Sequence, residues 1–439
     1  MNALTRRQML ARSAAALAGG ALLLGERSET QAGASPEPQA RASRPQSPGK
    51  GHLPVVTPNG ENLPWRLVGG VKVYHLIAEP VRHELAPGLS VNAWGYNGRV
   101  HGPTIEAVEG DRVRIYVTNR LPEPTSVHWH GILLPNGMDG VTGLNQRPIP
   151  PGETYRYEFT LRQHGTHMYH PHFDEMTQQA MGMMGLFIIH PRDPQPYRVD
   201  RDFAILLSEW QVKIGTARPD PGEMVDFNIL TMNGRAFPGT EPLCVRQGEK
   251  VRIRLGNLSA MSHHPIHLHG YKFMVTATDG GKIAPSAQWP ENTVLVPVGS
   301  SRDIEFAADE PGDWALHCHM THHVMNQMGH DIPNMIGMDA DGLDEKIQRL
   351  VPGYMTMGHT GMGGMGTMDM PVPRNSIPML GGEGPFGHID MGGMFTIVKV
   401  HPTLPGADDW YEQPPGTLAD KADAEEMRRD GIDLGGDSG

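Results

Sequence analysis

Histidines stand as His-x-His pairs at four places in the sequence. On a β-strand, residues two positions apart point to the same side, so each pair aims two imidazoles in one direction. One such pair is usually a surface accident, whereas four pairs in one chain predict a metal site. Imidazole ligands suit copper, zinc, iron or nickel, and eight of them without a carboxylate pattern favour copper. The pairs are His128 and His130, His170 and His172, His267 and His269, and His317 and His319.

The fourth pair lies in "WALHCHMTHHVMNQM" and encloses a cysteine, Cys318. Because it alternates with His317 and His319, the Cys318 side chain must point to the opposite face of the strand, into its own domain. Two His, one Cys and a weak axial Met form the ligand set of a blue electron-transfer copper. The candidate donors for this second site are Cys318 itself, His323 and Met328 after it, and His264, which precedes the third pair.

An internal repeat carries these motifs. "EGDRVRIYVTN…HWHG" (109–131) resembles "QGEKVRIRLGN…HLHG" (247–270), and each combines a turn, an alternating apolar strand and a His-x-His-Gly. "YEFTLRQHGTHMYHPH" resembles "IEFAADEPGDWALHCH", and "MGMMGLFIIHP" resembles "MGGMFTIVKVHP". Period-two alternation between Gly and Pro turns predicts strands. The repeat therefore predicts an all-β chain of two β-sandwich domains, at residues 60–198 and 199–402.

Length and composition agree with this organisation. A chain of 439 residues exceeds the usual size of one hydrophobic core, and 54 Gly with 39 Pro favour turns. The formal net charge of -12 argues against nucleic acid as a partner. Two cysteines in an exported protein could pair, but Cys318 has a use as a metal ligand, and Cys244 reads as a small buried hydrophobe.

The first residues predict an export signal. Arg6 and Arg7 precede an apolar run from Ala14 to Leu24, which is too short to span a membrane comfortably, and small residues follow at 32–34. This pattern is typical of a twin-arginine signal, which carries folded proteins out of the cytoplasm. We expect residues 1–34 to be the signal, residues 35–59 to be a linker, and the mature protein to be periplasmic and without a membrane segment.

The second repeat contains a methionine-rich insertion, placed at residues 329–390. From Met320 to Met394 the chain holds fourteen of its 27 methionines, many of them alternating with Gly. One interpretation is low-complexity disorder, and the other is soft thioether capture of Cu(I) for delivery to the cysteine site. An acidic tail follows at residues 403–439, which we expect to be poorly ordered unless it docks on a neighbour.

Taken together, "HWHG", "HPH", "HPIHLHG" and "HCH…H…M" resemble the multicopper oxidases, the laccase and cuprous oxidase group. The resemblance covers roughly residues 60–330 and the closing strand near 394–401. It implies two cupredoxin-like Greek-key β-sandwiches and four copper ions. The implied type 1 ligands are His264, Cys318, His323 and Met328. The implied type 2 ligands are His128 and His267. The implied type 3 ligands are His130, His170, His172, His269, His317 and His319.

The first repeat departs from the cysteine-site pattern. Thr125, Pro171 and Met176 stand where the second repeat has His264, Cys318 and His323. Resemblance to family members of this size implies a homotrimer, with the trinuclear copper cluster between domain one of one subunit and domain two of the next.

The resemblance also implies a reaction, in which a reductant gives single electrons to the type 1 copper and the trinuclear cluster reduces O2 to water. Oxygen reduction needs protons, and many relatives have an acid where this chain has Asp139. Asp139 precedes Gly140, so a plain turn residue is the other interpretation.

We favour Cu(I) as the reductant, in copper tolerance, and three alternatives remain open. A laccase would oxidise a small organic reductant such as a phenol with the same machinery. A copper nitrite reductase would place its type 1 cysteine in the first domain, where this chain has Pro171. A methionine-rich copper carrier or store would leave the oxidase sites vestigial, although all twelve expected ligand positions are filled.

Overall fold

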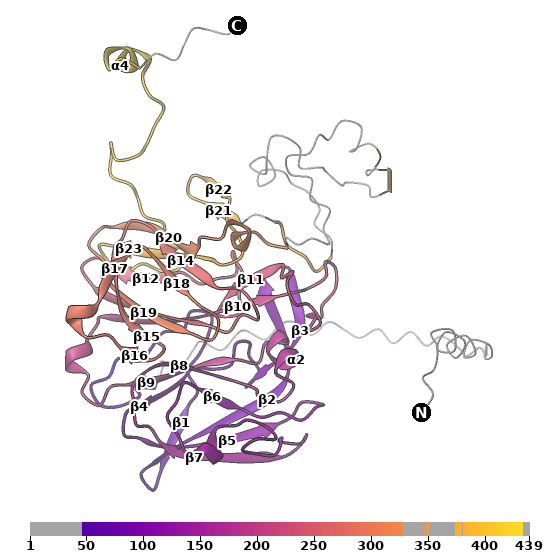
Figure 1. Cartoon of the computed structure of the whole chain (residues 1–439). Helices are drawn as coiled ribbons and strands as arrows, with labels where there is room; N and C mark the ends of the chain where they lie inside the picture. Colours follow the sequence, from indigo (N-terminus) through magenta and orange to yellow (C-terminus); the bar gives the residue numbers. More distant parts are fainter. Residues whose placement is uncertain (1–45, 328–345, 347–348, 351–373, 380, 433–439) are drawn as a thin grey trace. The chain divides into compact units, whose positions relative to one another are not determined.

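Alternation of apolar and polar residues produces the strands that carry the histidines. In a computed structural model, residues 46–327, 346, 349–350, 374–379 and 381–432 are described (Figure 1). The predicted signal, Met328 and most of the methionine-rich insertion lie outside these residues. Within the described part of the chain, strands predominate and no helix is long and apolar enough to cross a membrane.

The first sandwich consists of two sheets. A five-stranded sheet runs in the order β1 (Trp65–Val68), β2 (Val71–Ala86), β5 (Arg112–Asn119) and β7 (Thr154–Thr160), with β3 (Leu89–Tyr96) paired to β2. A four-stranded sheet runs in the order β4 (Ile105–Val108), β9 (Gly185–His190), β8 (Gly165–His170) and β6 (His128–His130). Short helices in its connections are η1 (Asn136–Met138), α2 (Glu175–Ala180) and η2 (Gln195–Tyr197).

The second sandwich repeats this plan. Its larger sheet runs in the order β11 (Ile229–Met232), β10 (Arg201–Trp210), β13 (Lys250–Asn257), β19 (Ser301–Ala307), β15 (Phe273–Thr278) and β16 (Gly281–Lys282), with β17 (Trp289–Glu291) paired to β15. Its smaller sheet runs in the order β12 (Leu243–Arg246), β23 (Phe395–His401), β20 (Gly312–Cys318), β14 (His264–Leu268) and β18 (Thr293–Val296). Around them lie η3 (Pro285–Ala287), η4 (Thr321–Val324), the hairpin β21 (Gly382–Gly384) and β22 (Gly387–Ile389), and α4 (Ala424–Arg429).

Equivalent strands pair in the same way in both sandwiches. β2 and β5 are parallel, as are β10 and β13, and the closing strands β9 and β23 are parallel to β4 and β12. The neighbouring pairs β6–β8 and β14–β20 are antiparallel, with His128 opposite His170 and His267 opposite His317. The all-β fold predicted from the repeat is therefore confirmed, and each sandwich brings two His-x-His strands side by side.

Each sandwich has its own apolar core, and a further cluster of buried apolar residues joins the two sandwiches. Trp129 and Phe187 belong to the first core, while Leu255 and Cys318 belong to the second. Between the sandwiches, Met168 on β8 and Leu186 on β9 pack against residues of β10. The strand β13 is buried almost throughout, whereas its counterpart β5 alternates, because β13 is covered on its outer face as well.

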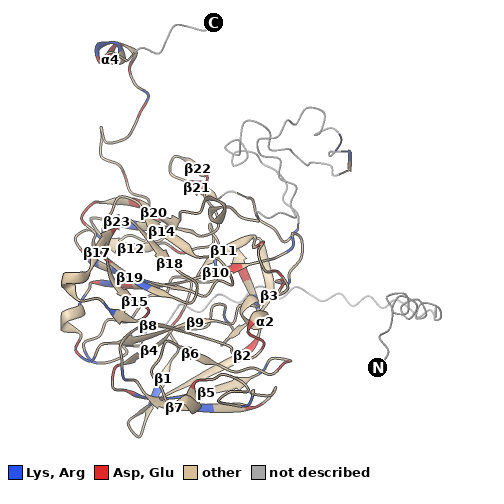
Figure 2. Ribbon diagram, in the orientation of Figure 1, with Lys and Arg blue, Asp and Glu red and all other residues tan. Residues whose placement is uncertain are grey.

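Charged groups also occupy this covered face of β13. Arg254 is 4% exposed in its side chain and donates to both carboxylate oxygens of Asp202, at 2.7 and 2.8 Å. Asp303 accepts from Thr166 of the first sandwich at 2.7 Å. Buried charges are tolerated when they are paired in this way. Acidic and basic residues are otherwise spread over both sandwiches (Figure 2).

Segments after the cysteine strand return to the sandwiches. Asn375, within the predicted insertion, accepts from Ser90 N at 2.8 Å and donates to Ser90 O at 3.0 Å. In the predicted tail, Tyr411 N donates to Asp313 at 2.8 Å, and Lys399 Nζ lies 3.9 Å from the Trp410 ring centroid. The C-terminal part of the insertion and the beginning of the tail are thus packed on the fold.

Candidate metal centre

Three of the four donors predicted for the cysteine site converge. β20 ends at Cys318, β14 begins at His264 and pairs with β20, and η4 carries His323 back over the strand ends. Cys318 Sγ lies 3.8 Å from His264 Nδ1 and 3.4 Å from His323 Nδ1, and the two Nδ1 atoms are 3.3 Å apart. We call these three residues the cysteine site. Met328, the predicted fourth ligand, lies outside the described residues.

Burial keeps the cysteine site uncharged until a cation binds. His264 and Cys318 are fully buried. Desolvation lowers the pKa of His264 to about 3 and, together with the neighbouring His322, that of His323 to about 4. Burial likewise raises the pKa of the Cys318 thiol to about 12. Two neutral imidazoles and a sulfur directed at one point fit a soft or borderline cation, which agrees with the predicted copper.

We therefore expect each ion bound at the cysteine site to release one proton between pH 6 and 8. The imidazoles are already neutral in this range, whereas the thiol must lose its proton to become a ligand. The affinity should rise about tenfold per pH unit. Titration of the metal-free protein with Co²⁺, which does not oxidise thiols, can measure both quantities in a weakly buffered solution. Cys318→Ser is the control, and an undiminished proton release in that variant would contradict the assignment.

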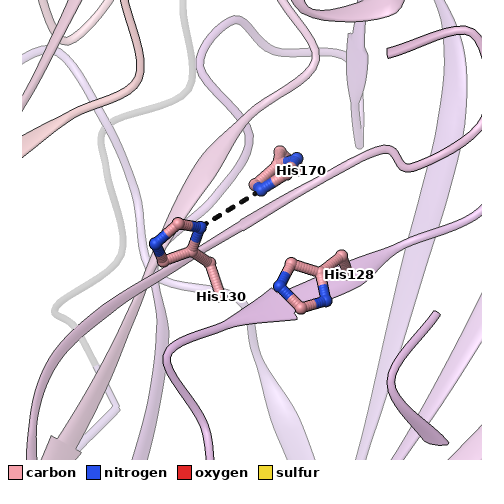
Figure 3. Close-up of side chains that lie close together, drawn as sticks. All are labelled: His128, His130 and His170. Atoms are coloured by element: carbon pink, nitrogen blue, oxygen red, sulfur yellow. Dashed lines mark hydrogen bonds between the residues drawn. The ribbon is translucent and has the colours of Figure 1, made fainter. Parts of the chain in front are cut away.

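The first quartet comprises His128, His130, His170 and His172. Figure 3 shows the rings of the first three close together; His128 and His130 come from β6, and His170 comes from β8. His130 Nδ1 approaches His170 Nε2 at 3.3 Å, and the ring centroid of His128 lies 5.4 to 5.8 Å from those of the other three. Desolvation lowers the pKa of His170 to about 3 and also lowers that of His130. The quartet is thus a set of close imidazoles, at least two of which burial keeps neutral and able to bind metal.

The second quartet comprises His267, His269, His317 and His319, and it repeats the first. His269 Nε2 lies 3.1 Å from His317 Nε2, and the centroid of His267 lies 4.8 to 5.7 Å from those of the other three. Burial lowers the pKa of both His269 and His317. His269 and His319 are nevertheless exposed to solvent.

Backbone carbonyls orient corresponding rings of the two quartets. The Nδ1 of His170 lies 2.9 Å from the oxygen of Pro171, and the Nδ1 of His317 lies 2.9 Å from that of Cys318. The Nδ1 of His128 lies 2.8 Å from Asp139 O, and that of His267 lies 2.7 Å from Asn292 O. An imidazole that donates its Nδ1–H to a carbonyl presents Nε2 as the metal-binding nitrogen. Two rings of each quartet are therefore oriented to bind through Nε2, whereas His130 turns its Nδ1 towards His170.

The quartets do not meet within one chain. Ring contacts link the histidines inside each quartet, and none of the contacts among described residues links one quartet to the other. The second quartet lies back to back with the cysteine site, because His317 and His319 flank Cys318 on the opposite face of the strand. The structure thus brings the twelve predicted ligands into three groups, Met328 excepted.

Asp139 lies where an acid was expected, beside the first quartet. Its backbone oxygen holds His128, and its Oδ1 is 3.5 Å from His128 Nδ1. A second acid was missed in the sequence: Glu175, the first residue of α2, has Oε1 3.3 Å from His170 Nδ1 and Oε2 3.7 Å from His172 Nε2. Its place five residues after His170, at the start of a helix, was the only signal that could have indicated it.

The first sandwich fills the equivalent of the cysteine site with other groups. Thr125, the counterpart of His264, is buried and donates to Gln178 Oε1 at 2.7 Å. Pro171 is buried, and Met176 is 62% exposed. A hydrogen-bonded Thr–Gln pair and a Pro offer no soft donor, so an electron-transfer copper has its donors in the second sandwich.

Comparisons with known proteins point to one family. Residues 79–194 and residues 213–336 match two family models, each described as multicopper oxidase, and together these span more than half of the chain. Copper resistance protein A from Escherichia coli is 33% identical over 237 residues, which are 43% of this chain and 39% of that protein. The chain thus spans about two fifths of that relative's length.

Solved structures give the same result over more of the chain. A blue copper oxidase from Nitrosomonas europaea is 26% identical, with a TM-score of 0.54, and the match covers 74% of this chain and 85% of that one. The multicopper oxidase mgLAC is 28% identical, with a TM-score of 0.56, and the match covers 79% of this chain and 90% of that one.

Proposed function

The chain belongs to the multicopper oxidase family, and on this premise we propose that it oxidises Cu(I) and reduces O2 to water, in copper tolerance. One observation carries the proposal: His317, Cys318 and His319 are consecutive at the end of β20. Cys318 belongs to the buried cysteine site, and the histidines on either side of it belong to the second quartet. Similarity to copper resistance protein A supports copper tolerance as the setting. Export through the twin-arginine pattern would place the protein in the periplasm, which cell fractionation can test.

Copper, when bound, supplies reversible one-electron chemistry at the cysteine site and O2 reduction at the quartets. The positions of the protein ligands would determine where the one-electron chemistry and the O2 reduction take place. His264, Cys318, His323 and Met328 would hold the type 1 ion. His128 and His267 would hold the type 2 ion, and the other six histidines would hold the type 3 pair. The peptide bonds that join Cys318 to its two neighbours provide the covalent path between the centres.

Each quartet supplies only half of the trinuclear ligands, so we propose that the active unit is a homotrimer. The first quartet of one subunit would meet the second quartet of the next. Separation of the quartets within a chain supports this arrangement, as does the exposure of His269 and His319, which a partner surface would cover. Closed ring assemblies use such head-to-tail interfaces.

Asp139 would supply protons for oxygen reduction next to His128. We expect Asp139→Asn to slow reoxidation of the reduced enzyme by O2 by about 10²-fold, because general acids contribute on this scale. Anaerobic bleaching of the blue band by Cu(I) should keep its rate, since the cysteine site is unchanged. Stopped-flow absorption separates the two half-reactions, and reoxidation at the wild-type rate would leave Asp139 as a turn residue.

Exposed thioethers next to the cysteine site support Cu(I) as the substrate. Met261 is 58% exposed three residues before His264, and Met320 is 45% exposed two residues after Cys318. Soft sulfur ligands favour Cu(I), and the methionine-rich insertion would add more of them.

We expect Met261→Leu with Met320→Leu to lower kcat/KM for Cu(I), and removal of residues 329–373 to lower it further. Oxidation of a phenolic dye should change little, because a phenol does not need thioether ligands. The deletion should end before Asn375, whose hydrogen bonds to Ser90 hold that part of the insertion on the first sandwich. Equal losses for both substrates, or no loss for Cu(I), would reject methionine capture.

A further inference from the structure

We propose that Glu209, at the end of β10, is a positioning residue that holds the loop 258–263 and thereby fixes His264 in the cysteine site. Glu209 Oε1 accepts hydrogen bonds from Met261 N at 2.5 Å and from Ser262 N at 3.1 Å. The residue is 6% exposed. The loop joins β13 to β14, and His264 follows it directly, so the carboxylate ties down the segment that precedes the ligand.

A side chain of the same loop carries this constraint to the imidazole. Ser259 Oγ lies 2.7 Å from His264 Nε2, and Ser259 N donates to Asn257 Oδ1 at 2.8 Å. With Nε2 held by the hydroxyl, Nδ1 is the nitrogen that faces Cys318. Asn257 therefore fixes the beginning of the loop, Glu209 fixes its end, and the serine between them sets the ring.

The first sandwich provides an internal comparison. Strand registers place Asn119 opposite Ala78 and Asn257 opposite Leu207, so the position of Glu209 corresponds to Pro80. Asn119 anchors its loop as Asn257 does. Each accepts from the amide two residues on, and each donates to a distant backbone carbonyl, Ile149 O or Val296 O. The asparagine is thus common to both repeats, whereas the carboxylate occurs only in the repeat that has the cysteine site.

The two loops also differ in the donors they offer. The first contains Pro122 and Pro124, which lack N–H groups and stiffen the chain covalently. The second, Leu258 to His263, contains no proline, so its amides need acceptors and its backbone needs another restraint. The Glu209 carboxylate accepts from two of these amides and thereby also restrains the loop backbone.

Glu209 is a costly way to stabilise a loop. Its second oxygen, Oε2, is buried and has no hydrogen-bond partner among the described residues. Burial of a carboxylate with one unsatisfied oxygen is unfavourable, and here desolvation raises the pKa of Glu209. Residues kept at such a cost commonly serve a functional site. Glu209 binds the segment that leads to His264.

A metal-free measurement tests the positioning directly. Cys318 is fully buried, and in a Cys244→Ala background it is the only thiol, so its reaction with a disulfide reagent reports opening of the cysteine site. We expect Glu209→Ala to speed this reaction about tenfold or more, because a hydrogen bond to a charged group is worth at least that factor. Glu209→Gln keeps an acceptor for the loop amides and should fall between Glu209→Ala and the parent.

A second measurement uses bound metal. Co²⁺ at the cysteine site gives a thiolate charge-transfer band, and Glu209→Ala should shift or weaken it while leaving metal uptake by the quartets unchanged. Glu249→Gln is the matched control: Glu249 is 7% exposed in the same sandwich and also accepts from a backbone amide, that of Arg246 at the end of β12, at 2.9 Å. This control should change overall stability without moving either readout.

The inference rests on the proposed role of the cysteine site, but thiol reactivity does not depend on that role. Parental thiol kinetics and an unchanged Co²⁺ band in Glu209→Ala would overturn the inference and leave the proposed function untouched. If Glu209→Ala does not fold, Glu209→Gln decides: a parental rate and band reject the inference, and a faster rate with a shifted band supports it. Loss of oxidase activity in the parent protein would reject the proposed function alone.

Discussion

Replacement of Cys318 by Ser is expected to abolish the blue absorption of the loaded protein and to reduce oxidation of both Cu(I) and a phenolic dye to background. Intense blue colour comes from copper bound to a cysteine thiolate, which a serine hydroxyl cannot replace at neutral pH. The only covalent path from the cysteine site to His317 and His319 carries electrons through that sulfur. Absorption spectra, copper content and turnover with each substrate measure the effect.

The fold should survive this substitution. Serine has nearly the volume of cysteine, although burial of a hydroxyl at this fully buried position costs about 1–3 kcal/mol. Copper bound by the quartets should remain, since their ligands point to the other face of β20. Cys244→Ser is the control and should keep both colour and turnover. A blue protein, or substantial turnover, in Cys318→Ser would remove Cys318 from the proposed mechanism.

Complementation between two inactive variants is the second large expected effect. His172→Ala disables the first quartet and His269→Ala the second. The His172 side chain is 37% exposed and His269 is exposed to solvent, so the fold should tolerate both changes. Each variant alone should be inactive, because every trinuclear cluster would lack a ligand. Co-expression should restore activity, since a subunit with an intact second quartet can then meet one with an intact first quartet.

The amount of recovery is set by counting interfaces. In head-to-tail trimers assembled at random from equal amounts of the two variants, about a quarter of the interfaces join two intact quartets, so activity should reach about a quarter of the wild type. Co-expression of His172→Ala with His130→Ala is the matched control and should restore nothing, because both changes affect the first quartet. A failure of the cross-quartet pair to recover, together with a fully active monomer in gel filtration, would reject the intersubunit cluster.

Much of the candidate site could be predicted because it depends on local geometry. Alternation along a strand fixes that His317 and His319 share a side and that Cys318 takes the other, whatever the rest of the chain does. The repeat also indicated that β6–β8 and β14–β20 would be equivalent, and the equal registers His128–His170 and His267–His317 agree with it. The all-β class followed from the same alternation between turn residues.

Contacts between distant segments could not be predicted in this way. Asp139 was expected for its carboxylate, yet its closest contact with His128 is through the backbone oxygen. Glu175 and Glu209 carry no motif. The turn into α2 folds Glu175 back onto His170, and Glu209 reaches Met261 from a strand 52 positions away. Hydrogen bonds of this kind depend on loop conformation and side-chain rotamers, which no periodic pattern in a single sequence predicts.

The sequence by itself determined the candidate ligands and their grouping on two faces of one strand, because a strand's period of two is a property of the local backbone. It also determined that the first repeat lacks a cysteine at the position of Cys318, where Pro171 stands. Only the tertiary structure decided which imidazole nitrogen faces the metal, that Glu209 and Ser259 hold His264, and that the two quartets of one chain lie apart. These depend on how β10, β14 and β20 pack and on loop conformation. Packing brings Glu209 to Met261, 52 positions away, and no pattern in the sequence links the two.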